Sequence, residues 1–129
     1  MESEVEFIDK LPLDEVLKEV QAADVLLLSS VEEGIANVVL EAMALGIVVI
    51  STDCGGMNEV VSDNVNGFLI PIRDDVSMAS ALQRVSKLSI EDYQKMTQSA
   101  RNTIENQHAH EKMVVEMLAF YQSVINTEL

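Results

Sequence analysis

The chain is poor in cysteine, in basic side chains and in long apolar runs. Its one cysteine, Cys54, excludes an internal disulfide and has no metal-ligand spacing with His108 or His110, so no metal site is expected. No apolar run reaches the ~18 residues that a membrane helix needs. The acidic N-terminus also lacks the pattern of a signal peptide. These absences predict a soluble cytoplasmic protein.

Basic residues are scarce and unevenly distributed. The chain has 8 Lys and Arg against 22 Asp and Glu, which gives a formal net charge of -14. Because proteins bind phosphate backbones largely through Lys and Arg, this charge excludes nucleic acid as an expected partner. No Lys or Arg occurs between Lys18 and Arg73. A site for a phosphorylated ligand within that stretch has no basic side chain of its own.

Motifs for common nucleotide cofactors are missing. Neither G-x-G-x-x-G after a strand nor G-x-x-x-x-G-K-[ST] occurs, and no cofactor is expected. Asp53 follows an apolar strand, as in a phospho-acceptor receiver domain, but the Lys that such a domain needs on a later strand is absent.

The chain has the size and composition of one folded domain over residues 1–129. A chain of this length buries roughly two-thirds of the surface of its unfolded form. Hydrophobic residues make up 48% of it, which argues against disorder. No internal repeat or Gly/Ser linker indicates a second domain.

Apolar runs alternate with helical patterns along most of the chain. Strands are expected at 5–8, 24–29, 47–52 and 68–70, and helices begin near 13, 37, 74 and 90. A short helix is expected at 59–62, and a last one from about 109 to 125 buries Met113, Val114, Met117, Leu118 and Tyr121. This order predicts an α/β fold: a partial Rossmann-like three-layer sandwich with a mainly parallel sheet of about four strands and C-terminal helices.

Several residues mark the ends and faces of these helices. Asn37 is a candidate N-cap, and Gly46 suits the left-handed position that ends the same helix. Residues 89–92, Ser-Ile-Glu-Asp, resemble a capping box, and Asn66-Gly67 indicates a turn. The helix near 74 is expected to bury one face, formed by Val76, Ala79, Leu82 and Val85.

Two glutamates flank the start of a helix that follows an apolar strand. Glu33 lies in the loop after residues 23–30, and Glu41 lies one to two turns into the next helix. Eight residues of helix would cover at most ~12 Å. Open α/β sheets bind ligands at the carboxyl ends of their strands, which is where this pair is expected.

The ordered segments ADVLLLSSVEEG, NVVLEAMALGIVVISTDCGGMNEVV and NGFLIPI resemble the second domain of group 1, retaining GT-B glycosyltransferases. The match runs from about Val5 to Ile72. It departs from the family where a proline usually precedes the glutamate of the second loop, since Asn58 stands there. The resemblance implies transfer of a sugar from a nucleotide-diphosphate sugar donor to an acceptor, between two domains that close over the donor. The products it implies are bacterial surface polysaccharides or glycoconjugates.

The resemblance also assigns roles to residues. It implies that Glu33 contacts the donor sugar, as a nucleophile or as a charge stabiliser at the anomeric carbon, and that Glu41 binds the ribose hydroxyls. It implies that backbone N–H groups at the helix start face the diphosphate or sugar, and these belong to Gly34, Ile35, Ala36 and Asn37. It also implies that Lys10 and Leu11, in the loop before the first helix, lie near the nucleobase. Gly55 and Gly56 resemble the second loop, to which a structural role is given.

The resemblance covers only part of a complete enzyme. A GT-B enzyme has a first domain, which binds the acceptor, and its cations for the diphosphate come from an upstream segment. The chain is therefore expected to be a fragment or a truncated reading frame that is inactive alone. The alternative is a non-catalytic or self-associating α/β module.

In such a fragment, residues 1–8 lose their usual neighbours, and this affects how the chain is expected to associate. Residues 1–8 pair against the strand near Val25, exchange with another chain, or fray. A homodimer is expected because a strand edge and an apolar helix face are left uncovered. Repulsion opposes this, since residues 1–41 hold 11 acids and 2 bases, a net -9.

Overall fold

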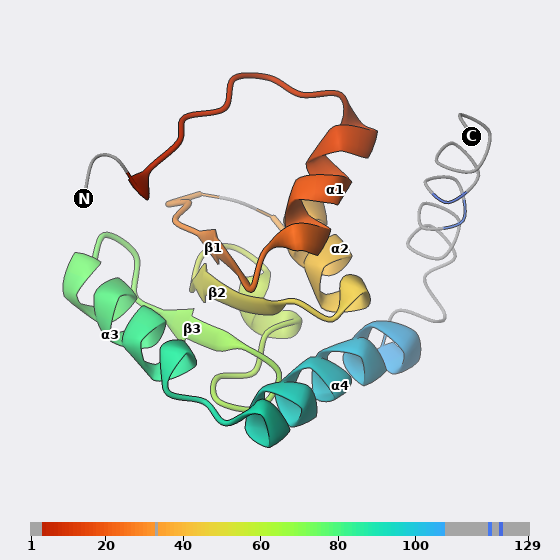
Figure 1. The fold of residues 1–129 in the computed structure, drawn as a ribbon. Coiled ribbons are helices and arrows are strands. Elements are labelled where there is room, and N and C mark those ends of the chain that lie inside the picture. Colours follow the sequence, from red (N-terminus) through yellow and green to blue (C-terminus); the bar gives the residue numbers. More distant parts are fainter. Residues whose placement is uncertain (1–3, 33, 108–118, 120–121, 123–129) are drawn as a thin grey trace.

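The computed structural model describes residues 4–32, 34–107, 119 and 122 and contains one parallel sheet with helices on both faces (Figure 1). In the described part, the strands lie in the order β1 (Val25–Leu28), β2 (Val48–Thr52) and β3 (Phe68–Ile70). The helices are α1 (Leu13–Ala22), α2 (Asn37–Leu45), the 3-10 helix η2 (Met57–Glu59), α3 (Asp75–Ser86) and α4 (Ile90–Gln107). The predicted α/β class and parallel sheet are confirmed.

The prediction of a strand at residues 5–8 is wrong. These residues form an exposed segment before α1, and Phe7 is 95% exposed. In Figure 1 the segment runs outside the sheet. A strand needs a neighbour to satisfy its backbone N–H and C=O groups, and this segment pairs neither with the free edge of β1 nor with another described strand. Among the described residues the sheet therefore has three strands, not four.

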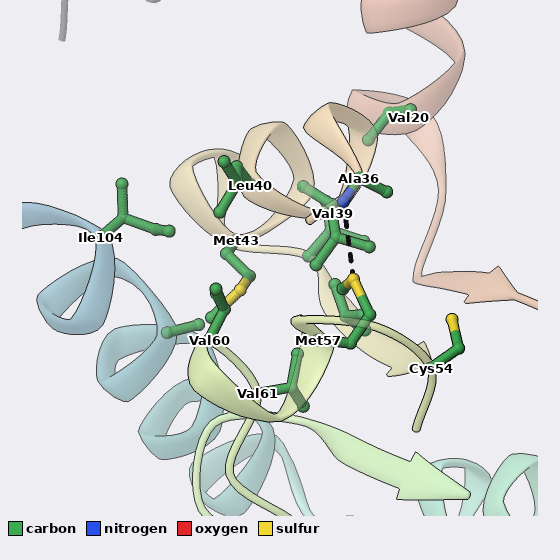
Figure 2. Packing of buried hydrophobic residues seen from close by; sticks show 14 residues of the cluster. Val20, Ala36, Val39, Leu40, Met43, Cys54, Met57, Val60, Val61 and Ile104 are labelled. Carbon is green, nitrogen blue, oxygen red and sulfur yellow. Dashed lines mark hydrogen bonds between the residues drawn. The ribbon is translucent and has the colours of Figure 1, made fainter. Parts of the chain in front are cut away.

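The sheet separates two apolar cores. Val49 of β2 faces the helix α2, whereas its neighbours Val48 and Ile50 face α3. The larger cluster, shown in Figure 2, joins α1, α2 and the segment around η2. The helix α4 passes from one core to the other, because Met96 joins the α3 side while Ala100 and Ile104 join the α2 side. This helix fixes both layers against the same sheet.

The face predicted for α3 is wrong except at Val85, which is buried. Val76 is 75% and Leu82 is 40% exposed, and Ala79 is exposed too. The buried face is instead formed by Ala81 and Val85, with Met78 half-buried beside them. Both sets have helical spacing, and the small Ala81 side chain allows the helix to lie close to Phe68 and Ile70 of the sheet.

Most of the predicted helix ends are confirmed. Gly46 ends α2 in the left-handed conformation with φ 80°, and the hydroxyl of Ser89 accepts a hydrogen bond from the Asp92 N–H at 3.0 Å. The turn before β3 holds a buried Asn66, whose side chain donates to Val60 O and to the hydroxyl of Thr103 at 3.0 Å each. The short helix expected at 59–62 lies earlier, at η2.

The predicted C-terminal helix, with its buried residues, and both histidines lie outside the described residues, except for Ala119 and Gln122, which are helical and exposed. Within the described ranges, no helix combines the length and apolar character that crossing a bilayer demands.

Candidate functional site

The loops that follow the three strands meet at one edge of the sheet. Residues 29–36 follow β1, residues 53–56 follow β2, and residues 71–74 follow β3. Because all three strands are parallel, their carboxyl ends point the same way. We call this the carboxyl edge, and it includes the start of α2.

Contacts from the first loop to the second loop and to the residues on either side of it fix their relative positions. The Thr52 hydroxyl donates to Ser30 O at 2.5 Å, and the Ala36 N–H donates to the Met57 sulfur at 3.5 Å (Figure 2). Gly56 lies so close to Ile35 that an added Cβ would sit 3.1 Å from its Cγ1. Gly56 therefore lets the second loop support the one that leads into α2.

The helix α2 begins at Asn37, as expected, but its N-cap differs from the prediction by one residue. Ala36, not Asn37, is the N-cap, with extended backbone at ψ 127°, and its carbonyl accepts from the Val39 N–H at 3.0 Å. Asn37 is the first helical residue and is exposed. The capping prediction for Asn37 is therefore wrong, because the packing of Ala36 against Met57 sets where the helix begins.

The four residues whose backbone N–H groups are expected to face the donor differ in exposure. Gly34 and Asn37 are exposed, Ile35 is half-buried and Ala36 is buried. A Cβ added at Gly34 would meet nothing within 4 Å, so packing does not require glycine there. Open space at Gly34 beside a helix N-terminus leaves room for a ligand to approach the backbone.

Glu41 is buried in α2, with 3% of its surface exposed. Buried carboxylates are uncommon unless they have an interaction partner, and Glu41 has one. A solvated helix residue, the simplest alternative for this position, is excluded by that burial. Glu33 lies outside the described residues, so the separation of the two carboxylates remains a prediction.

The loop expected near the nucleobase precedes α1. Lys10 is exposed, and its backbone N–H donates to the Asp9 carboxylate at 2.8 Å, while Leu11 is half-buried. No described contact joins either residue to the carboxyl edge.

Sequence reasoning overlooked Arg73. It lies in the loop after β3, and it is the one Lys or Arg in the three loops of the carboxyl edge. Its backbone has φ 55°, in the left-handed region that non-glycine residues seldom adopt. The available signal was its position three residues after the end of an apolar strand that a proline follows.

Metal ligands are not gathered in the described part of the chain. Residues 4–32 and 34–107 hold no group of three or more His, Cys, Asp or Glu side chains placed to share a metal ion. The edge thus offers hydroxyls, backbone groups, carboxylates and the single guanidinium of Arg73.

Comparison with known proteins identifies the family. Residues 1–87 match the family described as "Glycosyl transferases group 1". The chain belongs to this family. It is 34% identical over 135 residues to a putative colanic acid biosynthesis glycosyltransferase, WcaL, of Escherichia coli (strain K12). The match covers 100% of this chain and only 30% of that relative, so the chain spans about a third of the relative's length.

Solved structures agree with the fold. The C-terminal domain of a group 1 family protein, LpcC, from Francisella tularensis has a TM-score of 0.68 at 25% identity, covering 81% of this chain and 52% of that one. Anabaena Alr3699/HepE, solved in complex with UDP-glucose, has a TM-score of 0.67 at 22% identity, covering 79% of this chain and 29% of that one. The chain therefore has the fold of the C-terminal domain of GT-B glycosyltransferases.

Proposed function

We propose that this chain forms the donor-binding part of a group 1 glycosyltransferase and that its ligand is a nucleotide-diphosphate sugar. The observation that carries the proposal is the burial of Glu41 on α2, directly behind the helix start at the carboxyl edge. This edge is where open α/β sheets hold nucleotides. The likeness to a protein solved with UDP-glucose supports this class of ligand.

Glu41 binds the ribose in this account. A carboxylate offers about four lone-pair sites, so it accepts both ribose hydroxyls even when one site is already used. Burial lowers the local dielectric and strengthens such hydrogen bonds. Glu41 lies four residues after the first residue of α2, a rise of ~6 Å. That separation matches the step from a diphosphate at the helix start to the adjoining ribose.

The helix start binds the diphosphate and the sugar. The N–H groups of Gly34, Ile35, Ala36 and Asn37 belong to the segment at the positive end of α2, which favours negative ligands. Glu33 reaches the donor sugar, as a nucleophile or as a charge stabiliser. Lys10 and Leu11 contact the nucleobase when the donor is bound.

The carboxyl edge lacks the positive charge that a diphosphate needs. Arg73 is its one basic residue, against acids in all three loops. We therefore expect a first, acceptor-binding domain to supply both further cations and the acceptor. Likeness to a colanic acid biosynthesis enzyme supports a product in bacterial surface polysaccharide. The 129-residue chain alone binds its donor weakly and transfers no sugar.

Calorimetric titration of the purified chain with UDP, GDP and ADP tests the proposal. One of the three should bind, and adding the sugar of the true donor should strengthen that binding. Inorganic pyrophosphate is the control, because it offers charge without ribose or base. The proposal is wrong if no nucleoside diphosphate binds, or if pyrophosphate binds as tightly as the nucleotides do.

A second candidate, a non-catalytic self-associating module, is favoured by the absence of Lys and Arg between Lys18 and Arg73. It predicts association of the chain with no nucleotide binding, so the same titration separates the two.

A further inference from the structure

A basic, apolar pocket lies at the end of the sheet opposite the carboxyl edge. It encloses a cavity of about 490 Å³ between the turn before β3, the end of α3 and the first turns of α4. Phe68 and Met96, both buried, line it together with Leu88. We call it the α3–α4 pocket. Nothing in the proposed donor site uses these residues.

Three of the eight basic residues of the chain line this pocket, against one acid, Asp92: they are Arg84, Lys87 and Lys95. The Arg84 guanidinium lies over the Phe68 ring, 4.8 Å from its centroid, and donates to the Asn64 side chain. These two contacts hold one cation in place before any ligand arrives. Lys95 pairs with Glu91 at 3.5 Å, and both side chains are largely exposed.

The exposed segment before α1 has the complementary chemistry. Residues 4–9, Glu-Val-Glu-Phe-Ile-Asp, alternate acids with apolar side chains and contain no base. Phe7 is 95%, Val5 55% and Ile8 50% exposed, which is unusual for large apolar residues so close together. This segment combines the negative charge and the apolar surface that the α3–α4 pocket matches.

The segment does not reach the pocket of its own chain in this structure. In Figure 1 the start of the described chain lies far from the junction of α3 and α4, with α3 between them. We propose that residues 4–9 of a second copy of this chain dock into the α3–α4 pocket. Phe7 enters against Leu88 and Met96, and Glu4, Glu6 and Asp9 meet Arg84, Lys87 and Lys95.

Such a contact joins two different surfaces, so its symmetry matters. If each of two chains places its segment in the pocket of the other, the pair closes as a two-fold dimer. If only one contact forms, a free segment and a free pocket remain, and larger assemblies grow with concentration. In both cases assembly depends on the same residues.

A charge swap tests the proposal, with sedimentation equilibrium as the readout. The wild-type chain should exceed the monomer mass at ~100 μM in physiological salt. Glu4→Lys/Glu6→Lys should be monomeric, with association at least tenfold weaker. These two changes remove two negative charges and add two positive ones, which takes the net charge from -14 to -10. Reduced repulsion alone would strengthen association, so a loss points to the segment itself.

The second arm reverses the pocket with Lys87→Glu/Lys95→Glu, which should also be monomeric. An equimolar mixture of the two variants should associate again, because each segment then finds a pocket of opposite charge. Circular dichroism and thermal unfolding establish that both variants fold. The matched control, Glu15→Lys/Glu19→Lys on α1, changes the net charge equally and should keep the wild-type association.

Three results would overturn the docking. They are a wild-type chain that stays monomeric, a Glu4→Lys/Glu6→Lys variant that associates normally, and a mixture of the two variants that stays monomeric. Loss of association in Leu27→Lys, with both charge variants unaffected, would assign assembly to the exposed edge of β1. The nucleotide titration proposed above is independent of all these outcomes.

Discussion

The two ends of the sheet have opposite charge. The three loops of the carboxyl edge contain four acids and one base: Glu32, Glu33, Asp53, Asp74 and Arg73. Residues 84–101, at the other end, contain four of the eight bases of the chain and two acids. A chain with a net charge of -14 thus concentrates its positive charge away from the edge where we propose that the anionic donor binds.

The difference shows what kind of ligand each end suits. In the proposed donor site, recognition at the carboxyl edge depends on backbone N–H groups and on the buried Glu41 carboxylate, which suits hydroxyl groups and leaves a diphosphate short of cations. At the α3–α4 pocket, fixed and exposed cations surround an apolar floor, which suits acidic side chains. The predictions below perturb these two ends separately.

The largest effect is expected at the floor of the α3–α4 pocket. Phe68 is 2% exposed and belongs to the core between the sheet and α3. Phe68→Ala should lower the free energy of unfolding by about 3–5 kcal/mol, because it leaves a cavity in that core. The control is Val65, which lines the same pocket and is 58% exposed. Val65→Ala should change the free energy of unfolding by about 0.5 kcal/mol or less. Equal losses in urea unfolding would mean that the pocket floor is not part of the core.

A smaller effect of opposite sign is expected from the left-handed residues. Asn64 (φ 66°) lies at the pocket end and Arg73 (φ 55°) at the carboxyl edge. Arg73→Gly should raise the free energy of unfolding by about 0.5–1 kcal/mol, since glycine adopts this conformation without strain. Asn64→Gly should gain less, because asparagine tolerates the region and its side chain holds Arg84. If urea unfolding gives Asn64→Gly the larger gain, the explanation by backbone strain fails.

The smallest effect concerns pH and the cap of α3. The N–H and hydroxyl of Ser77 donate to the Asp74 carboxylate at 2.9 and 2.8 Å, and these bonds lower the pKa of Asp74 below its ordinary value of 3.8. Because the folded pKa is the lower one, the stabilisation is present above pH ~4 and is lost as the pH falls through the folded pKa. Thermal unfolding from pH 6 to 3 should therefore be less pH-dependent in Asp74→Asn than in wild type. Asp75→Asn is the control of equal charge, and an identical effect of both variants would contradict the assignment to the cap.

Sequence reasoning predicted the parallel sheet because its strands are short apolar runs bounded by turn residues, and such runs are read locally. The segment at residues 5–8 has the same pattern, yet it forms no strand, since no described strand lies beside it to complete its hydrogen bonds. A strand depends on its neighbour, and pattern alone does not supply one.

Only part of the candidate site was predicted, because the rest also depends on contacts between distant segments. The order of strand, loop and helix placed Glu41 on α2, but the burial of its side chain depends on neighbours that only the fold brings together. The α3–α4 pocket was missed because Arg84, Lys87 and Lys95 belong to two helices and converge only in three dimensions. The clustering of bases in residues 84–101 was the one available signal.

The most direct test of the account compares two ligands and two proteins. The nucleoside diphosphate that binds best and its 2′-deoxy form are titrated into the wild-type chain and into Glu41→Ala. Glu105→Ala, an exposed glutamate on α4, serves as the control protein. Circular dichroism checks that each variant folds.

The account predicts that Glu41→Ala weakens binding of the ribose form by ~1–3 kcal/mol, about 5- to 150-fold, because hydrogen bonds to a charged group have this strength. It also predicts that wild type prefers the ribose form while Glu41→Ala binds both forms equally. Equal affinity of wild type and Glu41→Ala for the ribose form would contradict the assignment of Glu41 to the donor ribose.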